Sequence, residues 1–83
     1  MDALWSLIVD ELPHLRRYAR ALARDSTDAE DLVQACVERA LRHADTFVPE
    51  KGLRPWLFRI EHNLHCSALR RRRRERTLPQ TAR

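Results

Sequence analysis

The sequence contains very little glycine and no long apolar stretch. Gly52 is the one glycine among 83 residues, and β-branched residues are few, whereas Ala, Leu, Arg and Glu abound. This mixture favours helices over a sheet. No apolar run approaches the ~18 residues that a membrane span requires, and residues 1–8 lack the basic start of a signal peptide. The composition therefore predicts one small, soluble, cytoplasmic all-α domain with no membrane partner.

The sequence also lacks the patterns that carry catalysis or hold a cofactor. There is no glycine-rich phosphate loop, no nucleophile elbow and no pair of carboxylates facing a basic cleft. His62, His65 and Cys66 come together at helical spacing, but three ligands on one exposed helix make a poor zinc site. Cys36 and Cys66 are interpreted as reduced thiols. We therefore expect no catalytic residue, no metal, no cofactor and no enzyme activity.

Acidic and basic residues are divided sharply along the chain. Residues 1–50 carry six arginines against ten acids, a net charge of −4. Residues 51–83 carry ten basic residues against Glu61 and Glu75, a net charge of +8. An acidic half joined to a basic half indicates two different partners, one of them a polyanion.

Apolar periodicity predicts a first helix over residues 13–24, with Pro13 in its first turn. Residues 2–10 are expected to form a short separate helix that folds back through Leu4, Trp5 and Ile8. A capping box of Thr27 and Glu30 predicts the start of a second helix that ends near residue 44 or 45. The buried residues expected on the first two helices are Leu12, Leu15, Ala19, Leu22, Ala29, Leu32, Val33, Cys36, Val37, Ala40 and Leu41.

A loop over residues 45–52 is followed by a third predicted helix, which runs to about residue 75. Its expected apolar stripe is Trp56, Leu57, Ile60, Leu64 and Ala68. None of these helices is long enough to be stable alone, so the prediction is a small bundle of three main helices plus the short N-terminal one.

The polar face of the third helix is the most informative surface. Arg59, Asn63, Arg70 and either Cys66 or Ser67 fall on one side at about 100° per residue. Arginines bind phosphates, and an asparagine between them can bind base edges. The nearby rings of Phe47, Trp56 and Phe58 are able to stack on bases. Spacing alone leaves open the alternative that the aromatic residues are core and the arginines simply solvated.

Three motifs occur in an order that resembles a known family. They are Asp-Ala-Glu-Asp-Leu-Val-Gln at residues 28–34, Leu-Arg-Pro-Trp-Leu-Phe-Arg-Ile at residues 53–60, and Asn63-Leu64 before an arginine-rich end. Together they resemble region 2 of sigma-70 family RNA polymerase sigma factors. The resemblance is greatest to the extracytoplasmic-function group, which includes the general-stress factors of alphaproteobacteria.

The resemblance implies a transcription initiation domain that binds core RNA polymerase and melts the promoter −10 element by capturing the single-stranded non-template strand. Asp31, Gln34 and Glu38 would contact the clamp helices of the polymerase β′ subunit. An anti-sigma factor is a further implied partner. The implied DNA-binding residues are Phe47 and Lys51 in the loop, Trp56, Arg59, Asn63 and Ser67 on the third helix, and Arg70, Arg71, Arg73 and Arg74 at its end.

The sequence departs from the family at several places. Ala35 replaces an acid that usually follows the glutamine, and residues 65–68 replace a usual apolar residue and acid. We expect region 2 over residues 1–76, a linker or flexible tail over 77–83, and no −35-reading region 4. Two alternatives remain open: a sigma-like module that sequesters an anti-sigma factor, and a generic basic nucleic-acid-binding helical domain.

Overall fold

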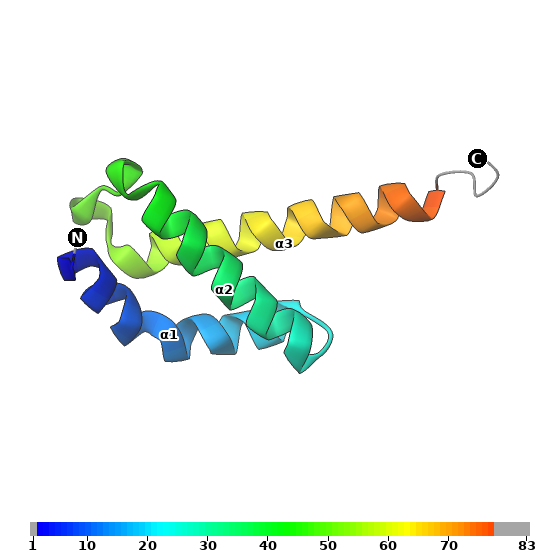
Figure 1. Ribbon diagram of the computed structural model, residues 1–83, viewed down its shortest axis with the longest axis horizontal. Coiled ribbons are helices and arrows are strands. Elements are labelled where there is room, and N and C mark those ends of the chain that lie inside the picture. Colours follow the sequence, from blue (N-terminus) through cyan, green and yellow to red (C-terminus); the bar gives the residue numbers. More distant parts are fainter. Residues whose placement is uncertain (1, 78–83) are drawn as a thin grey trace.

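The computed structural model describes residues 2–77 and consists of three α-helices joined by short connections (Figure 1). They are α1 (Asp2–Leu22), α2 (Ser26–Arg42) and α3 (Leu53–Thr77). Two single turns of 3-10 helix, η1 (Ala44–Thr46) and η2 (Pro49–Lys51), lie between α2 and α3. The predicted all-α bundle of three main helices is confirmed. The predicted tail lies, apart from Thr77, outside the described residues.

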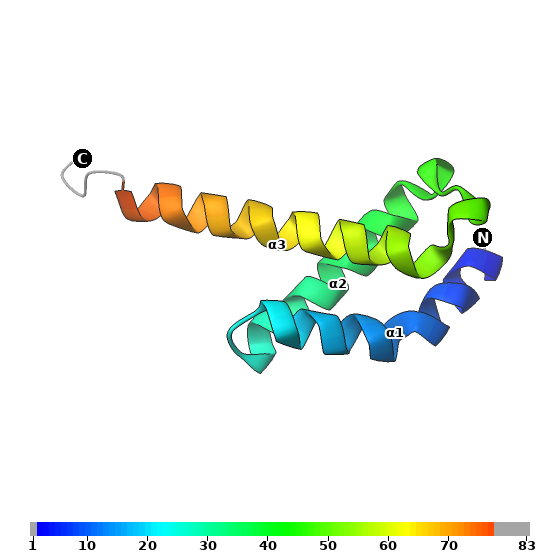
Figure 2. The same ribbon diagram turned by 180° about the vertical axis from the view of Figure 1, so that it is seen from behind.

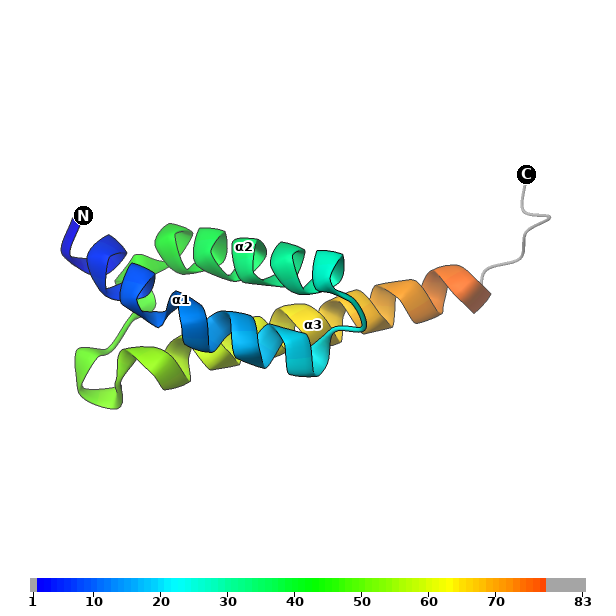
Figure 3. The ribbon, with the colours of Figure 1, turned by 90° about the horizontal axis from the view of Figure 1, so that it is seen from below.

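The long helix α3 projects beyond the other two. All three pairs of helices are in contact, and Figures 1 and 2 show α2 crossing one side of the pair formed by α1 and α3. Seen from below in Figure 3, the last turns of α3 continue past the turn that joins α1 to α2. The domain is therefore elongated, 50 × 25 × 19 Å, and its arginine-rich end stands away from the core.

The first helix differs from the prediction, because residues 2–22 form one helix with Pro13 inside it. A proline in a helix interior removes one backbone hydrogen bond and bends the helix, at a cost of about 3 kcal/mol. Figure 1 shows α1 bending in its first half. Helical spacing places Ile8 on the same side as Leu15 and Ala19, and all three are fully buried. Burial of these side chains offsets the lost hydrogen bond.

The second helix begins two residues before the predicted capping box. Asp25 is the N-cap residue: its backbone is extended, and its carboxylate accepts a hydrogen bond of 2.8 Å from the backbone N–H of Asp28. The capping box of Thr27 and Glu30 was therefore a wrong prediction. An aspartate accepts this hydrogen bond as well as a threonine does, and its charge also favours the positive end of the helix dipole.

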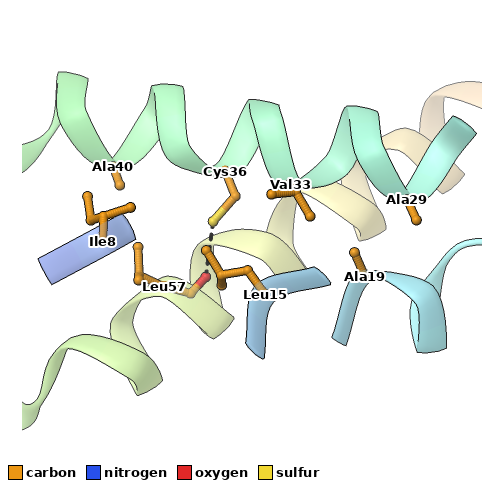
Figure 4. Packing of buried hydrophobic residues seen from close by; sticks show 8 residues of the cluster. All are labelled: Ile8, Leu15, Ala19, Ala29, Val33, Cys36, Ala40 and Leu57. Atoms are coloured by element: carbon orange, nitrogen blue, oxygen red, sulfur yellow. Dashed lines mark hydrogen bonds between the residues drawn. The ribbon is translucent and has the colours of Figure 1, made fainter. Parts of the chain in front are cut away.

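The core lies where α2 crosses α1 and α3 (Figure 4). Four residues of α2 form its buried stripe: Ala29, Val33, Cys36 and Ala40. Leu57 is the one buried apolar residue of α3 among the described residues, and its carbonyl oxygen accepts a hydrogen bond of 3.4 Å from the Cys36 thiol. The helices are thus held by small and medium-sized side chains, which permit close approach.

Two predicted core residues are largely exposed. Leu41 is 43% exposed and Trp5 is 46% exposed. Leu41 follows Ala40 by one position, so it lies about 100° around the helix from the buried stripe. Leu32 and Val37 of the same predicted stripe are half-buried and pack against the core. The stripe of α2 is therefore narrower than the periodicity predicted.

Replacement of the N-cap should measure how much α2 depends on Asp25. We expect Asp25→Ala to lower the free energy of unfolding by about 1 kcal/mol, because the backbone N–H of Asp28 loses its acceptor. Thr27→Ala is the matched control and should change stability by less than about 0.5 kcal/mol. Urea unfolding followed by circular dichroism measures both. A larger loss for Thr27→Ala would mean that the capping box operates in solution.

Candidate functional site

A groove runs between α2 and α3 and reaches the turn that joins α1 to α2. Its volume is about 790 Å³. Leu32 of α2 and Ile60 and Leu64 of α3 provide apolar lining, and charged residues of both helices surround them. Five of the predicted site residues line this groove: Asp31, Trp56, Asn63, Ser67 and Arg71. The structure therefore brings part of the predicted polymerase contact and part of the predicted DNA contact to one concave surface.

The outer face of α2 carries the three residues predicted to bind polymerase. Asp31, Gln34 and Glu38 are all exposed. Their spacing of three and four residues places them on one face of the helix, opposite the buried stripe. None of them is part of the buried core. This face thus presents two carboxylates and one amide to solvent.

The exposed face of α3 carries most of the predicted DNA-binding residues. Arg59, Asn63, Ser67 and Arg70 are exposed, as the helical spacing predicted. The Arg70 guanidinium donates a hydrogen bond of 3.2 Å to the Ser67 hydroxyl, one turn earlier. The remaining predicted arginines, also exposed, are Arg71, Arg73 and Arg74.

The aromatic residues divide between two sides of α3. Phe47 lies with its ring centroid 5.0 Å from that of Trp56, tilted by 37°, and both are half-buried. Phe58 instead stacks on Tyr18 of α1 at 4.6 Å. The suggestion that Phe58 stacks on bases is therefore wrong, because helical spacing turns its ring toward α1. Lys51 ends η2 as an exposed residue.

The entry into α3 is positioned by two features that sequence reasoning did not use. Gly52 has φ +91° and ψ 144°, a backbone conformation that residues with a Cβ rarely adopt. Immediately after it, the Arg54 guanidinium donates to the Glu11 carboxylate of α1 at 2.7 Å. The glycine thus permits the sharp turn after η2, and the ion pair joins the start of α3 to α1.

Sequence reasoning also missed the residues that face one another across the groove. Asp28 of α2 and Arg72 of α3 both line it, and the two side chains approach to 4.0 Å. In the sequence, Asp28 is only part of the motif at residues 28–34, and Arg72 is the one arginine of residues 70–74 that is not among the implied DNA contacts. Their juxtaposition has no signal in the sequence, because it depends on how α3 crosses α2.

The candidate metal ligands do not form a complete set. The Cys66 sulfur lies 3.4 Å from Nε2 of His62, one turn earlier on α3. Within residues 2–77, no group of three or more histidine, cysteine or acidic side chains is placed to hold a metal ion. In the same part of the chain, no helix combines the length and apolar character needed to cross a membrane.

Comparison with known proteins agrees with this arrangement of helices and motifs. The family described as the Sigma2 domain of PhyR matches residues 8–62. The chain belongs to the sigma-70 region 2 family. It is also 43% identical over 74 residues to the ECF RNA polymerase sigma factor EcfG of Rhodopseudomonas palustris (strain TIE-1). The match covers 89% of this chain and 41% of that relative, and no solved structure matches significantly.

This region 2 domain has a carboxylate in its core. Glu61 of α3 is fully buried, and neither carboxylate oxygen has a hydrogen-bond partner within the described residues. Burial raises the pKa of Glu61 from 4.5 to about 7. Burial, followed by the nearby charge of Glu61, raises the pKa of Cys36 from 9.0 to about 12. Sequence analysis counted Glu61 only as an acid, because its burial follows from the position of α3.

The raised pKa of Glu61 should make stability depend on pH. A carboxyl group whose pKa is higher in the folded state stabilises the fold below its unfolded pKa, and that contribution is lost as pH rises. The loss in the free energy of unfolding should extend from about pH 4.5 to about pH 7 and amount to roughly 3 kcal/mol. Glu61→Gln should remove this slope and be more stable than the wild type above pH 7. Urea unfolding over this pH range measures the slope.

Glu75→Gln provides the matched control, since Glu75 is an exposed glutamate of the same helix. Its slope of stability against pH should equal that of the wild type. If Glu61→Gln retains the wild-type slope, the carboxylate of Glu61 is solvated in solution.

Proposed function

We propose that this domain binds core RNA polymerase through the outer face of α2 and captures the single-stranded −10 non-template strand with α3. The observation that carries the proposal is the placement of Asp31, Gln34 and Glu38. All three are exposed opposite the buried stripe, so none serves the core of the domain. A carboxylate surface of this kind complements a basic surface on the β′ clamp helices.

The opposite charge of the two halves supports separate partners for α2 and α3. The exposed end of α3 carries five successive arginines, residues 70–74, on turns that project past the rest of the domain (Figures 1 and 3). Arginines placed around a projecting helix are able to follow phosphates along several of its sides. Binding through them depends strongly on salt, because phosphate contacts release counterions.

Base reading is proposed for the middle of α3 and the preceding connection. Asn63 is exposed and lines the groove, and its side-chain amide is able to donate and accept hydrogen bonds at the edge of an unpaired base. The rings of Phe47 and Trp56 are packed together beside the start of α3 and present an aromatic surface. Lys51, which lies between the two rings in sequence, and Arg59, which follows them, are exposed and would hold the backbone of the opened strand.

Membership of this family supports a role in transcription initiation in the cytoplasm, at the bacterial nucleoid, without catalysis by the domain itself. An anti-sigma factor that covers the groove would block both proposed surfaces, since Asp31 and Asn63 line it together. The linker or flexible tail over residues 77–83 stays a prediction.

Binding to purified bacterial core polymerase tests the α2 surface. We expect saturable binding that Asp31→Ala with Gln34→Ala weakens by about 1–3 kcal/mol, because a charged contact and an amide contact are both lost. Asp10→Ala removes one negative charge from an exposed position on α1 and should leave the affinity unchanged. Fluorescence anisotropy of the labelled domain measures all three proteins. Equal affinities for the double variant and Asp10→Ala would rule out this surface.

Single-stranded oligonucleotides, offered to the complex with core polymerase, test the α3 surface. Arg71→Gln should weaken binding to all sequences and reduce the slope of log affinity against log salt by about 1. Asn63→Ala should instead weaken binding to the −10 sequence by about 1–3 kcal/mol, relative to its effect on binding to scrambled sequences. If the isolated chain binds every nucleic acid in a salt-sensitive way and never binds polymerase, it is a generic basic module.

A further inference from the structure

The groove between α2 and α3 is lined by acids and by arginines, and α2 contributes Arg39 as well as its acids. Asp28 and Asp31 line it from α2, while Arg71 and Arg72 line it from the arginine-rich end of α3. An Nη2 atom of Arg72 lies 4.0 Å from Oδ2 of Asp28. One arginine of the proposed DNA-binding surface therefore already has an anionic partner within the domain.

The position of Asp28 is set by the start of α2. Its backbone N–H is held by the Asp25 carboxylate at 2.8 Å, so this residue stays within the first turn. Arg72, in contrast, extends from a turn near the projecting end of α3. The carboxylate is thus attached to an anchored backbone, and the guanidinium reaches toward it with a long and flexible side chain.

The ion pair is exposed enough to be replaced. The side chains of Arg72 and Asp28 are 50% and 43% exposed. Exposed pairs of this length are weak and are screened by salt. A phosphate group is able to displace such a carboxylate, and it gains further contacts from neighbouring arginines when it belongs to a nucleic-acid strand.

We propose that Asp28 is an internal competitor of nucleic acid for Arg72 and thereby lowers the affinity of this domain for polyanions. The inference rests on the proposed function of residues 70–74 as phosphate-binding arginines. A strand releases Arg72 from Asp28 only when it offers several phosphates at once. The Arg72–Asp28 ion pair therefore disfavours the binding of isolated phosphates more than the binding of an extended strand.

The test compares two variants that change the net charge equally. Asp28→Asn and Glu30→Gln each remove one negative charge from the N-terminal half of α2, but Glu30 is exposed and does not line the groove. The 83-residue chain is titrated into a fluorescein-labelled single-stranded DNA oligonucleotide at low salt. We expect Asp28→Asn to raise the affinity about two- to fivefold above that of Glu30→Gln, and this ratio should decrease as salt is added.

Arg72→Gln distinguishes competition for Arg72 from simple repulsion of the strand by Asp28. In the Arg72→Gln background, the substitution Asp28→Asn should raise affinity no more than Glu30→Gln does. The proposal is overturned if Asp28→Asn raises the affinity in the Arg72→Gln background as much as it does in the presence of Arg72. It is also overturned if Asp28→Asn and Glu30→Gln have equal affinities in the presence of Arg72. If none of these proteins binds the oligonucleotide, the proposed DNA-binding function fails, and the competition fails with it.

Discussion

The position of α3 depends on the packing of Leu57 against the other two helices. Among the described residues this is the one apolar side chain of α3 that is buried, whereas α1 contributes three and α2 contributes four. Its carbonyl oxygen also accepts the thiol hydrogen bond of Cys36, which links α3 to the centre of α2 (Figure 4). Every residue of the candidate site on α3 takes its direction from this contact, because a rigid helix transmits the orientation of one turn to the next.

Glu61 lies one turn after Leu57 on α3, and its buried carboxylate destabilises this part of the core when it is charged. A buried carboxylate without a hydrogen-bond partner is costly in its charged form, and burial accordingly raises its pKa to about 7. The arrangement leaves the core of a small domain sensitive to the protonation of one residue. The Arg54–Glu11 ion pair lies at the beginning of the same helix and gives α3 a second attachment to α1.

Charge is organised so that neighbouring surfaces interact with each other as well as with partners. Glu38 is exposed on the outer face of α2 and does not line the groove, whereas Asp28 lines it and approaches Arg72, and Asp31 is exposed and also lines it. Acids on one helix therefore have two different environments within a few residues of sequence. This separation permits one short helix to present an acidic surface outward and to moderate a basic surface beside it.

The sequence by itself determined the three main helices, most of their apolar stripes and the exposure of Asp31, Gln34 and Asn63. These features follow from helical periodicity, which is local and is visible in the spacing of residues. The start of α2 at Asp25 was missed although it is local, because two capping patterns lay two residues apart. Only the tertiary structure decided that Pro13 lies inside α1, that Phe58 stacks on Tyr18, that Glu61 is buried and that Arg72 meets Asp28. The last three of these depend on the angle at which one helix crosses another, and that angle results from the packing of all three helices together.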